Sequence, residues 1–273
     1  MRTRSTPLPG TQLLEVVAND EIARGVHALV LRRPDAAGSA PDPGTFLDLL
    51  PVLPAARGGA PVLRRPISIA DSSADGRDLT VILRIVGEGT RALCELPVGT
   101  TVDSLGLLGH GFDPDAVAPG GRALLIGGGV GVPPLHLLAR RLVERDVTVQ
   151  LRLGFRDADD VFWADRFAEL GQVLISTDDG SAGSRGTVAD LESVPGAAEF
   201  SPDAVYACGP LPMLRYVQRA FGPQMPTQLS LEERMACGVG ACYACVVTDA
   251  ADPGHQHRIC YDGPVFDAQE VVL

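Results

Sequence analysis

The sequence predicts a mixed fold, α/β plus all-β, in three parts: an antiparallel β-barrel, a parallel α/β domain and a small C-terminal domain. Three observations predict it. Residues 1–118 hold short apolar runs separated by turns rich in proline and glycine, as in small barrels. Strand and helix patterns alternate over 119–225, as in βαβ units. Residues 226–273 follow neither period and hold four of the six cysteines.

The strands of the barrel follow from the apolar runs in order. The runs at 12–34, 45–53, 66–73 and 78–87 predict strands, and the polar segment 34–44 predicts a loop. The turn at 87–89 then leads into a short helix predicted over Thr90–Leu96, with the Thr90 hydroxyl as its N-cap.

The α/β domain shows buried-type strands, each followed by apolar residues at helical spacing. The strands are predicted at 122–128, 147–155, 172–177 and 203–209, and the helices at 132–145, 159–170 and 211–222. This alternation predicts a parallel sheet with helices on its faces.

The charge balance excludes several functions. The chain has 23 basic and 34 acidic side chains and a net charge of −11. It therefore lacks the basic surface that nucleic acid requires, and an anionic membrane surface would repel it. No stretch reaches the roughly 18 apolar residues of a membrane helix, and the N-terminus lacks the apolar core of a signal peptide. We expect a cytoplasmic protein with no nucleic acid or membrane partner.

The C-terminal cysteines have the spacing of a metal centre. Three of them follow the pattern C-x4-C-x2-C and a fourth comes later, which is the ligand spacing of plant-type 2Fe-2S clusters: Cys237, Cys242, Cys245 and Cys260. Gly238 and Gly240 would let the backbone wrap closely around two irons. A zinc site is the alternative, although zinc usually takes two short cysteine pairs. Cytoplasmic thiols stay reduced, so disulfides are not expected.

Two histidines lie close to the last of these cysteines. His255 and His257 would suit a Rieske centre, but four cysteines already suffice, so we interpret them as part of a solvated polar loop. Cys94 is interpreted as a buried core residue.

A glycine-rich turn joins the first α/β strand to its helix. The run from Gly127 to Pro134 places glycines where phosphates bind at a helix N-terminus, and prolines suit the first helical turn. A glycine loop alone is also compatible with a purely structural turn. Cys208 and Gly209 end a later strand, at the sheet edge where α/β proteins bind ligands. Cys208 could equally be a core residue.

The barrel carries a second candidate phosphate site. Arg65 precedes the strand that begins Pro66-Ile67-Ser68, and an arginine together with the turn at 87–90 would bind a pyrophosphate. A surface charge before a proline is the alternative for Arg65.

Together these segments resemble the ferredoxin–NADP reductase superfamily, with a flavin barrel and a Rossmann-like nicotinamide domain. The motifs that carry the resemblance are RRPISI, VGEGT, LIGGGVGVPPL, YACGPLPML and the cysteine loop CGVGACYACVV. Within the superfamily the chain is similar over nearly its whole length to the electron-transfer subunits of class 1B dihydroorotate dehydrogenases.

The resemblance implies roles for particular residues. The FAD site would comprise Arg65, Pro66, Ile67, Ser68, Gly89 and Thr90, with Ser68 near the flavin ring. The NAD site would comprise Gly128, Gly129, Gly131 and Gly209, with Cys208 as the catalytic residue near the nicotinamide. The four late cysteines would bind the cluster. Ile67 stands where the superfamily often has tyrosine, and His110 stands where asparagine is expected. Asp157, Asp159 and Asp160 are candidates for binding a ribose.

The resemblance also implies a direction and a partner. Electrons would pass from the FMN of a dihydroorotate dehydrogenase catalytic subunit through the cluster and FAD to NAD, in pyrimidine biosynthesis, within a heterotetramer of two plus two subunits. Alternative partners are the other enzymes that share this layout, of the sulfide dehydrogenase, transhydrogenase or hydrogenase type. A zinc-stabilised interaction module is a third interpretation. An oxygenase reductase is disfavoured, because about 48 residues are too few for a ferredoxin domain.

Overall fold

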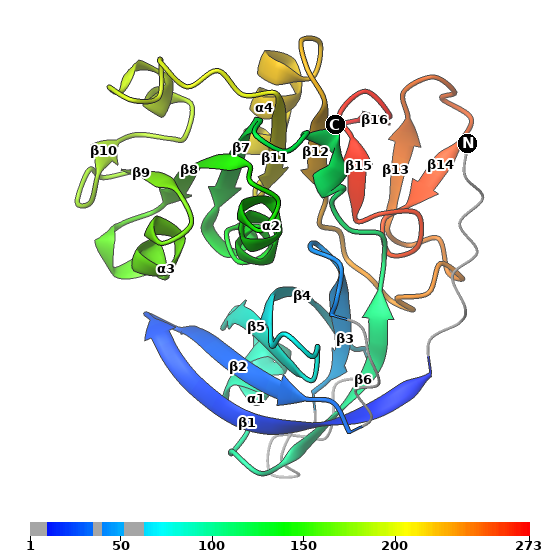
Figure 1. The fold of residues 1–273 in the computed structure, drawn as a ribbon. Coiled ribbons are helices and arrows are strands. Elements are labelled where there is room, and N and C mark those ends of the chain that lie inside the picture. The colour runs from blue at the N-terminus through cyan, green and yellow to red at the C-terminus, as the bar shows by residue number, and fades with distance from the viewer. Residues whose placement is uncertain (1–9, 35–39, 52–62) are drawn as a thin grey trace.

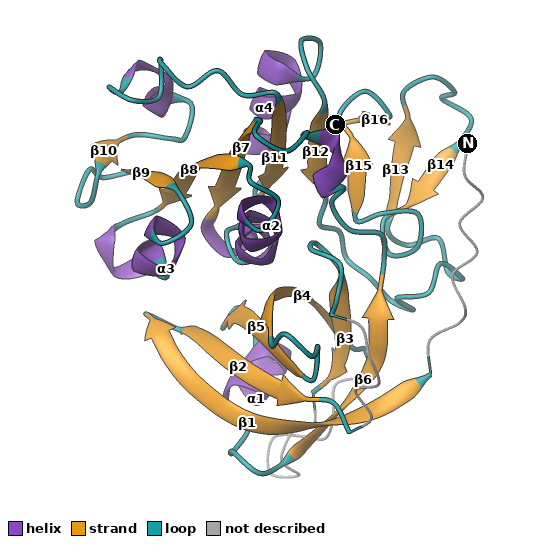
Figure 2. Cartoon of the chain, viewed as in Figure 1, coloured by secondary structure: helices purple, strands orange, loops and turns teal. Residues whose placement is uncertain are grey.

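The computed structural model describes residues 10–34, 40–51 and 63–273. They form a closed barrel, a seven-stranded sheet with helices and a three-stranded sheet (Figures 1 and 2). The N-terminal segment, part of the predicted loop at 34–44 and the end of the predicted strand 45–53 lie outside the described residues. Within the described ranges, every helix is too short or too polar to cross a membrane.

The barrel is antiparallel throughout, as predicted. Its strands are β1 (Thr11–Ala23), β2 (Val26–Arg32), β3 (Phe46–Leu50), β4 (Arg65–Ser72), β5 (Asp78–Arg84) and β6 (Thr101–Leu108), closed in the order β1-β2-β5-β4-β3-β6. Alternate side chains point inward, so that Leu14, Leu29 and Val81 are fully buried in the barrel core. Closure leaves the barrel without open strand edges.

The helix between β5 and β6 begins earlier than the sequence indicated. Helix α1 covers Glu88–Cys94, and its N-cap is Gly87. The prediction that Thr90 is the N-cap is therefore wrong. Thr90 is the third helical residue, and its hydroxyl accepts a hydrogen bond from the backbone N–H of Val86 at 2.9 Å. The hydroxyl thus holds the turn in front of the helix, whereas a capping side chain would stand at its start.

The α/β domain is a sheet of order β10-β9-β8-β7-β11-β12-β15, parallel except for its last strand. Its strands are β7 (Arg122–Gly128), β8 (Thr148–Phe155), β9 (Gln172–Thr177), β10 (Ser184–Arg185), β11 (Ala204–Cys208), β12 (Thr227–Ser230) and β15 (Val265–Asp267). The helices are α2 (Pro134–Val143), α3 (Ala164–Ala168) and α4 (Leu211–Phe221), with short 3-10 turns between elements at 114–116, 129–131, 158–160 and 190–193.

The helix predicted at 159–170 is interrupted. A 3-10 turn, Ala158–Asp160, and the shorter α3 replace it, because Trp163 takes a left-handed backbone conformation with φ of 56°. One residue in the left-handed region is enough to break a right-handed helix, and the spacing of the apolar residues does not reveal it.

Helix α2 joins the two larger parts of the molecule. It lies between the sheet and the barrel in Figure 1. Its Leu137 is fully buried in the barrel core, and the guanidinium of Arg140 pairs with the carboxylate of Asp71 on β4. The barrel and the α/β domain are therefore packed against each other through an apolar contact and an ion pair.

The C-terminal part contributes to two sheets. Its own sheet has the order β14-β13-β16, formed by β13 (Val246–Asp249), β14 (Gln256–Arg258) and β16 (Val271–Val272). Strands β12 and β15 instead extend the large sheet beyond residue 225. The large sheet therefore contains strands from both sides of the boundary predicted at residue 225.

Candidate functional site

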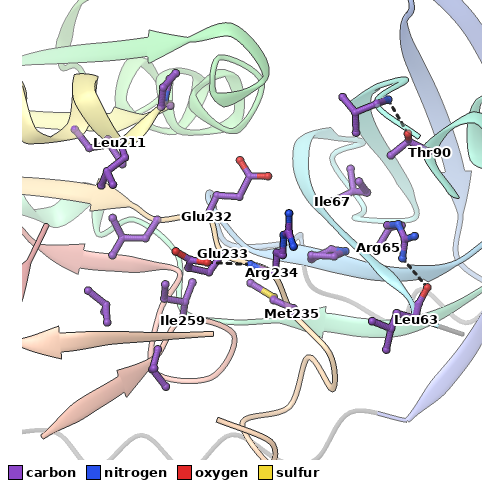
Figure 3. A pocket seen from close by; sticks show the side chains of 18 of the residues that line it. Leu63, Arg65, Ile67, Thr90, Leu211, Glu232, Glu233, Arg234, Met235 and Ile259 are labelled. Atoms are coloured by element: carbon purple, nitrogen blue, oxygen red, sulfur yellow. Dashed lines mark hydrogen bonds between the residues drawn. The ribbon is translucent and has the colours of Figure 1, made fainter. Parts of the chain in front are cut away.

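A cavity of about 960 Å³ lies between the barrel and the C-terminal part. Figure 3 shows Arg65, Ile67 and Thr90 on one side of it and Leu211, Glu232 and Ile259 on the other. A Cβ on Gly89 would lie only 2.7 Å from Nε of Arg65, so the guanidinium rests directly on the first turn of α1. An arginine held against backbone N–H groups fits the pyrophosphate of FAD.

The β4 residues of the predicted FAD motif line a continuous wall. Pro66 and Ile67 border both the large cavity and a smaller one of about 180 Å³, and Ser68 borders the smaller one. Ser68 pairs with Phe46 and Ile67 with Leu47 on β3, which fixes the direction of β4. The wall offers an apolar side chain beside a hydroxyl, which suits the mixed character of a flavin ring.

A second cavity, of about 640 Å³, lies above the carboxyl ends of the parallel strands, where α/β sheets bind nucleotides. The predicted residues Gly128, Gly129, Gly131 and Gly209 all line it. A Cβ on Gly131 would meet the carbonyl oxygen of Cys208 at 2.4 Å, and one on Gly128 would meet Cδ of Pro210 at 2.7 Å. Only glycine permits this approach of two loops.

Cys208 lies where these spaces meet. It borders the small cavity together with Ile67 and Ser68 of the barrel and Gly131 of the nucleotide loop. Burial raises the pKa of the Cys208 thiol to about 12, and a hydrogen bond with Ser230 opposes that shift. The thiol is therefore protonated at neutral pH and is a poor nucleophile.

Glu232 is a residue that the sequence analysis missed. It lines all three cavities. Its position just after Ser230, at the end of β12, is the signal that could have found it, because the ends of parallel strands carry ligand-binding residues. The strand itself was hidden, since 226–273 shows no clear period.

The ribose candidates separate into two groups. Asp157 and Asp159 pair with Arg24 of the β1–β2 turn, at 2.8 and 3.2 Å, and neither borders the nucleotide cavity. Asp160 borders it but is itself paired with Arg84 at 3.1 Å. Asp178, which follows β9, also borders the cavity and was not predicted. A surface ion-pair cluster thus accounts for the first two carboxylates.

The four C-terminal cysteines are brought together as free thiols. Cys245 and Cys260 are each 2% exposed, whereas Cys242 is exposed. The Cys260 sulfur accepts a hydrogen bond from the backbone N–H of Gly240 at 3.2 Å, and the Cys245 sulfur accepts one from the N–H of Cys260 at 3.4 Å. Backbone donors aimed at sulfur stabilise thiolates, which is the form that binds iron.

The acidity of two of these thiols agrees with that arrangement. Burial works against ionisation of Cys237, but hydrogen bonds from the backbone N–H groups of Val239 and Cys242 outweigh it and lower its pKa to about 7. A hydrogen bond from the Cys260 thiol, with backbone donors, lowers the pKa of Cys245. That same hydrogen bond raises the pKa of Cys260, so Cys237 and Cys245 are the two thiols that ionise more readily than usual.

The backbone of the cysteine loop turns sharply at two glycines. Gly238 and Gly240 have left-handed φ values of 68° and 78°, which glycine adopts without strain. Three cysteines in one such loop and a fourth later in the chain are the ligand pattern of a plant-type 2Fe-2S cluster, whereas structural zinc usually takes two short cysteine pairs.

Three further residues find places in the structure. Cys94 is 3% exposed in the barrel core, as predicted. The N–H of His110 donates to the carbonyl of Gly263 at 2.6 Å, which joins the end of the barrel to the C-terminal part. His257 departs from the solvated loop we expected, because it lies in β14 with its side chain 12% exposed and bonded to Asp249.

This combination defines a class of protein: a flavin- and nicotinamide-dependent reductase of the ferredoxin–NADP reductase type, with a 2Fe-2S centre at its C-terminal end. Comparisons with known proteins agree. Residues 232–272 match the family model of the iron–sulfur cluster binding domain of dihydroorotate dehydrogenase B. The electron transfer subunit of dihydroorotate dehydrogenase B (NAD(+)) from Listeria monocytogenes is 45% identical, over 95% of this chain and 98% of the relative. The corresponding subunit from Bacillus mycoides is 44% identical, over 96% and 98%. The chain belongs to this family of electron transfer subunits.

Solved structures show the same architecture. The NADH-dependent reduced ferredoxin–NADP oxidoreductase, studied for flavin-based electron bifurcation, matches with a TM-score of 0.78 and 30% identity over 98% of this chain and 91% of that chain. The ferredoxin reductase of carbazole 1,9a-dioxygenase matches with a TM-score of 0.65 and 23% identity, over 82% and 68%, which shows the fold alone. The predicted fold class is confirmed, as are the cofactors FAD, 2Fe-2S and NAD.

Proposed function

We propose that this chain is the electron-transfer subunit of an NAD-dependent dihydroorotate dehydrogenase, passing electrons from the FMN of a separate catalytic subunit to NAD in de novo UMP synthesis. The observation that carries the proposal is the presence, in one chain, of two nucleotide cavities that meet at Cys208 and of a four-thiol loop beside them. Its membership of the family, with 45% identity over 95% of the chain to one relative, supports the choice of substrate.

When bound, FAD exchanges a hydride with the nicotinamide and single electrons with the cluster. The residues of the chain arrange this exchange. We assign Arg65, with the turn before α1, to the FAD pyrophosphate, and Ile67 with Ser68 to the flavin ring. Gly131 lets the nucleotide loop pack directly on the backbone of Cys208, and we assign the neutral thiol of Cys208 to keeping water from the point where the two sites meet.

The catalytic subunit would dock at the cluster loop. Ala241, Cys242 and Tyr243 are exposed there, and Tyr243 is 58% exposed. An exposed aromatic beside small residues is typical of the centre of a protein interface. We propose an assembly of two subunits of each kind. The six unpaired cysteines suit a reducing cytoplasm.

A second candidate function has one observation in its favour. The NADH-dependent reduced ferredoxin–NADP oxidoreductase shares the whole architecture at 30% identity, so this layout also occurs in an enzyme with another name and reaction. In that case the chain would serve a different catalytic partner. The higher identity of 45% to the dihydroorotate dehydrogenase subunits favours the first candidate.

The test separates the work of the two subunits. Alone, with FAD and cluster in place, the chain should oxidise NADH with ferricyanide and should form no orotate from dihydroorotate and NAD. Addition of the FMN-containing catalytic subunit should create the second activity. Orotate formation by the isolated chain, free of FMN, would contradict the proposal. A catalytic subunit that neither binds the chain nor restores orotate formation would favour the second candidate.

A further inference from the structure

The C-terminal sheet carries a second group of ligand-type side chains, separate from the four cysteines. His255 and His257 are two residues apart at β14, and side chains at that spacing on a strand share one face. Their ring centroids lie 4.9 Å apart at an interplanar angle of 87°. The two imidazole rings therefore lie side by side and nearly perpendicular to each other on one small sheet.

A carboxylate completes the group from the neighbouring strand. Asp249 ends β13, and the register that pairs Val247 with His257 and Thr248 with Gln256 continues to place Asp249 opposite His255. Its Oδ2 lies 2.8 Å from Nε2 of His257. The ligand atoms of the three residues all lie within 4.8 Å of one another.

The carboxylate is held in place independently of the histidines. Its Oδ1 accepts hydrogen bonds from the backbone N–H of Ala251 at 2.7 Å and of Asp252 at 2.9 Å. Backbone hydrogen bonds, from Asp252 first, keep the pKa of Asp249 below its usual value. Oδ2 is thus an ionised oxygen aimed at His257. Glu270 offers a fourth ligand atom, a carboxylate oxygen 3.9 Å from Nε2 of His257.

We propose that Asp249, His255 and His257, with Glu270 as a fourth ligand, form a zinc-binding site. Imidazole nitrogen and carboxylate oxygen are the non-thiol ligands that zinc prefers, and four of them complete a tetrahedron. Ligand atoms on one zinc lie roughly 3.3–3.6 Å apart, so the three atoms that lie within 4.8 Å of one another, and the Glu270 oxygen beside them, would draw together as the metal binds.

The position of the site gives it a structural role. Cys245 directly precedes β13 and Cys260 follows β14, so both lie at one end of this hairpin. The proposed ligands lie toward the other end and reach the adjoining strand β16 through Glu270. Zinc would hold the three strands together and would fix the frame that carries two cluster thiols.

The experiment uses the full chain with FAD and an intact cluster, prepared without oxygen. Zinc should bind in a ratio of one per chain while the iron content stays constant, and it should raise the melting temperature. Cobalt(II), a probe of zinc sites, should give a visible spectrum without the intense sulfur-to-cobalt bands that binding to the cysteines would produce. X-ray absorption at the zinc edge should show only nitrogen and oxygen neighbours.

Variants identify the ligands. His255→Ala should weaken zinc binding by more than the 10–100-fold typical of outer-shell residues, and so should His257→Ala. Gln256→Ala is the matched control, because this exposed residue lies between the two histidines with its side chain on the opposite face. His255→Ala is decisive, since His255 is exposed and outside the described ion pairs, so it should fold normally. Zinc bound through sulfur, zinc binding unchanged in His255→Ala, or no zinc bound beyond the cluster would each overturn the site.

Discussion

Cys208 and Cys242 place the same side chain in different surroundings, the first half-buried beside a cavity and the second exposed. The carbonyl oxygen of Cys208 would lie 2.4 Å from a Cβ on Gly131, and burial raises the pKa of its thiol to about 12. Cys242 is exposed, in a loop where Tyr243 is 58% exposed. The junction of the nucleotide sites is therefore closed by backbone contacts, and the cluster loop is open to a partner.

The difference follows from what each end must exchange. A hydride passes only between groups in direct contact, and water must be kept away from it. The junction of the nucleotide sites at Cys208, where the hydride would pass, is therefore the closed end of the molecule. A single electron can cross between proteins without a covalent path. The cluster loop around Cys242, the open end of the molecule, therefore needs only a surface that a second subunit can approach. Four substitutions can break or sharpen this contrast.

Cys242→Ser has the largest expected effect, because it removes one of the four thiolate ligands. Iron and acid-labile sulfide per chain should fall strongly, and dihydroorotate oxidation by the complex with NAD should be lost by a factor of roughly 100 or more. FAD content and the NADH–ferricyanide reaction should remain close to those of the parent, because the closed end does not use Cys242.

Cys94→Ala is the matched control for that experiment. Cys94 is 3% exposed in the barrel core, far from any proposed ligand role, so the variant should keep its iron. Unchanged iron and sulfide in Cys242→Ser would show that Cys242 is not a cluster ligand, and the contrast with Cys208 would then have no basis.

The sequence predicted the motifs at the two ends of this contrast but not the way in which the structure surrounds them. Cysteine spacing was enough to predict a set of cluster ligands, and the glycines at 128–131 were enough to predict a nucleotide loop, because both motifs are local; the individual residue roles stay predictions. The enclosure of Cys208 was not predictable, since it depends on loops that meet only after the sheet has formed. Glu232 was missed for the same reason. Strand β12 joins the large sheet through pairing with β11, and its four residues are too few to show a periodicity that would predict this pairing.

Asp48→Asn tests the contact between the barrel and the cluster loop. Asp48 is 2% exposed on β3, and a Cβ on Gly238 would lie 2.5 Å from its Oδ2. Burial raises the pKa of Asp48 from 3.8 to about 6, partly offset by the charges of Arg64 and Arg65. At neutral pH the folded chain therefore carries a poorly solvated carboxylate, which costs about 3 kcal/mol at most.

The sign of this effect fixes the pH dependence. Between about pH 4 and pH 6 the folded chain holds a proton that the unfolded chain releases, so the free energy of unfolding falls as pH rises through this window. Asp48→Asn mimics the protonated form. It should match the parent at pH 4 and exceed it by about 2–3 kcal/mol at pH 8, measured by denaturant unfolding with circular dichroism. Equal stability of the two chains at pH 8 would show that Asp48 is adequately solvated.

Gly131→Ala tests the closed end directly. The added Cβ meets backbone atoms of Cys208, which cannot move aside as a flexible side chain could. Overpacking of this kind destabilises the fold by about 1–3 kcal/mol. The loop relieves the contact by moving away from Cys208, which displaces it from the dinucleotide, so KM for NADH should rise by roughly 10-fold or more, with FAD and iron content unchanged. Gly10→Ala is the control, because nothing lies within 4 Å of a Cβ there. A parental KM in Gly131→Ala would mean that the two loops do not hold the nicotinamide.

Cys208→Ala should have the smallest effect, because the thiol acts by filling space. Its removal leaves a small gap where Ile67, Ser68 and Gly131 border one cavity, and a gap at that junction admits water and loosens the nicotinamide. We expect flavin reduction by NADH, followed by stopped flow, to slow by about 3–10-fold, equivalent to about 1 kcal/mol, with normal FAD content. Because burial raises the pKa of the thiol to about 12, the parental rate should show no thiol titration between pH 6 and pH 9, and Cys208→Ser should recover part of the lost rate. If Cys208→Ala reduces its flavin as fast as the parent, Cys208 is a packing residue of the sheet edge, and the closed end depends on the glycine loops alone.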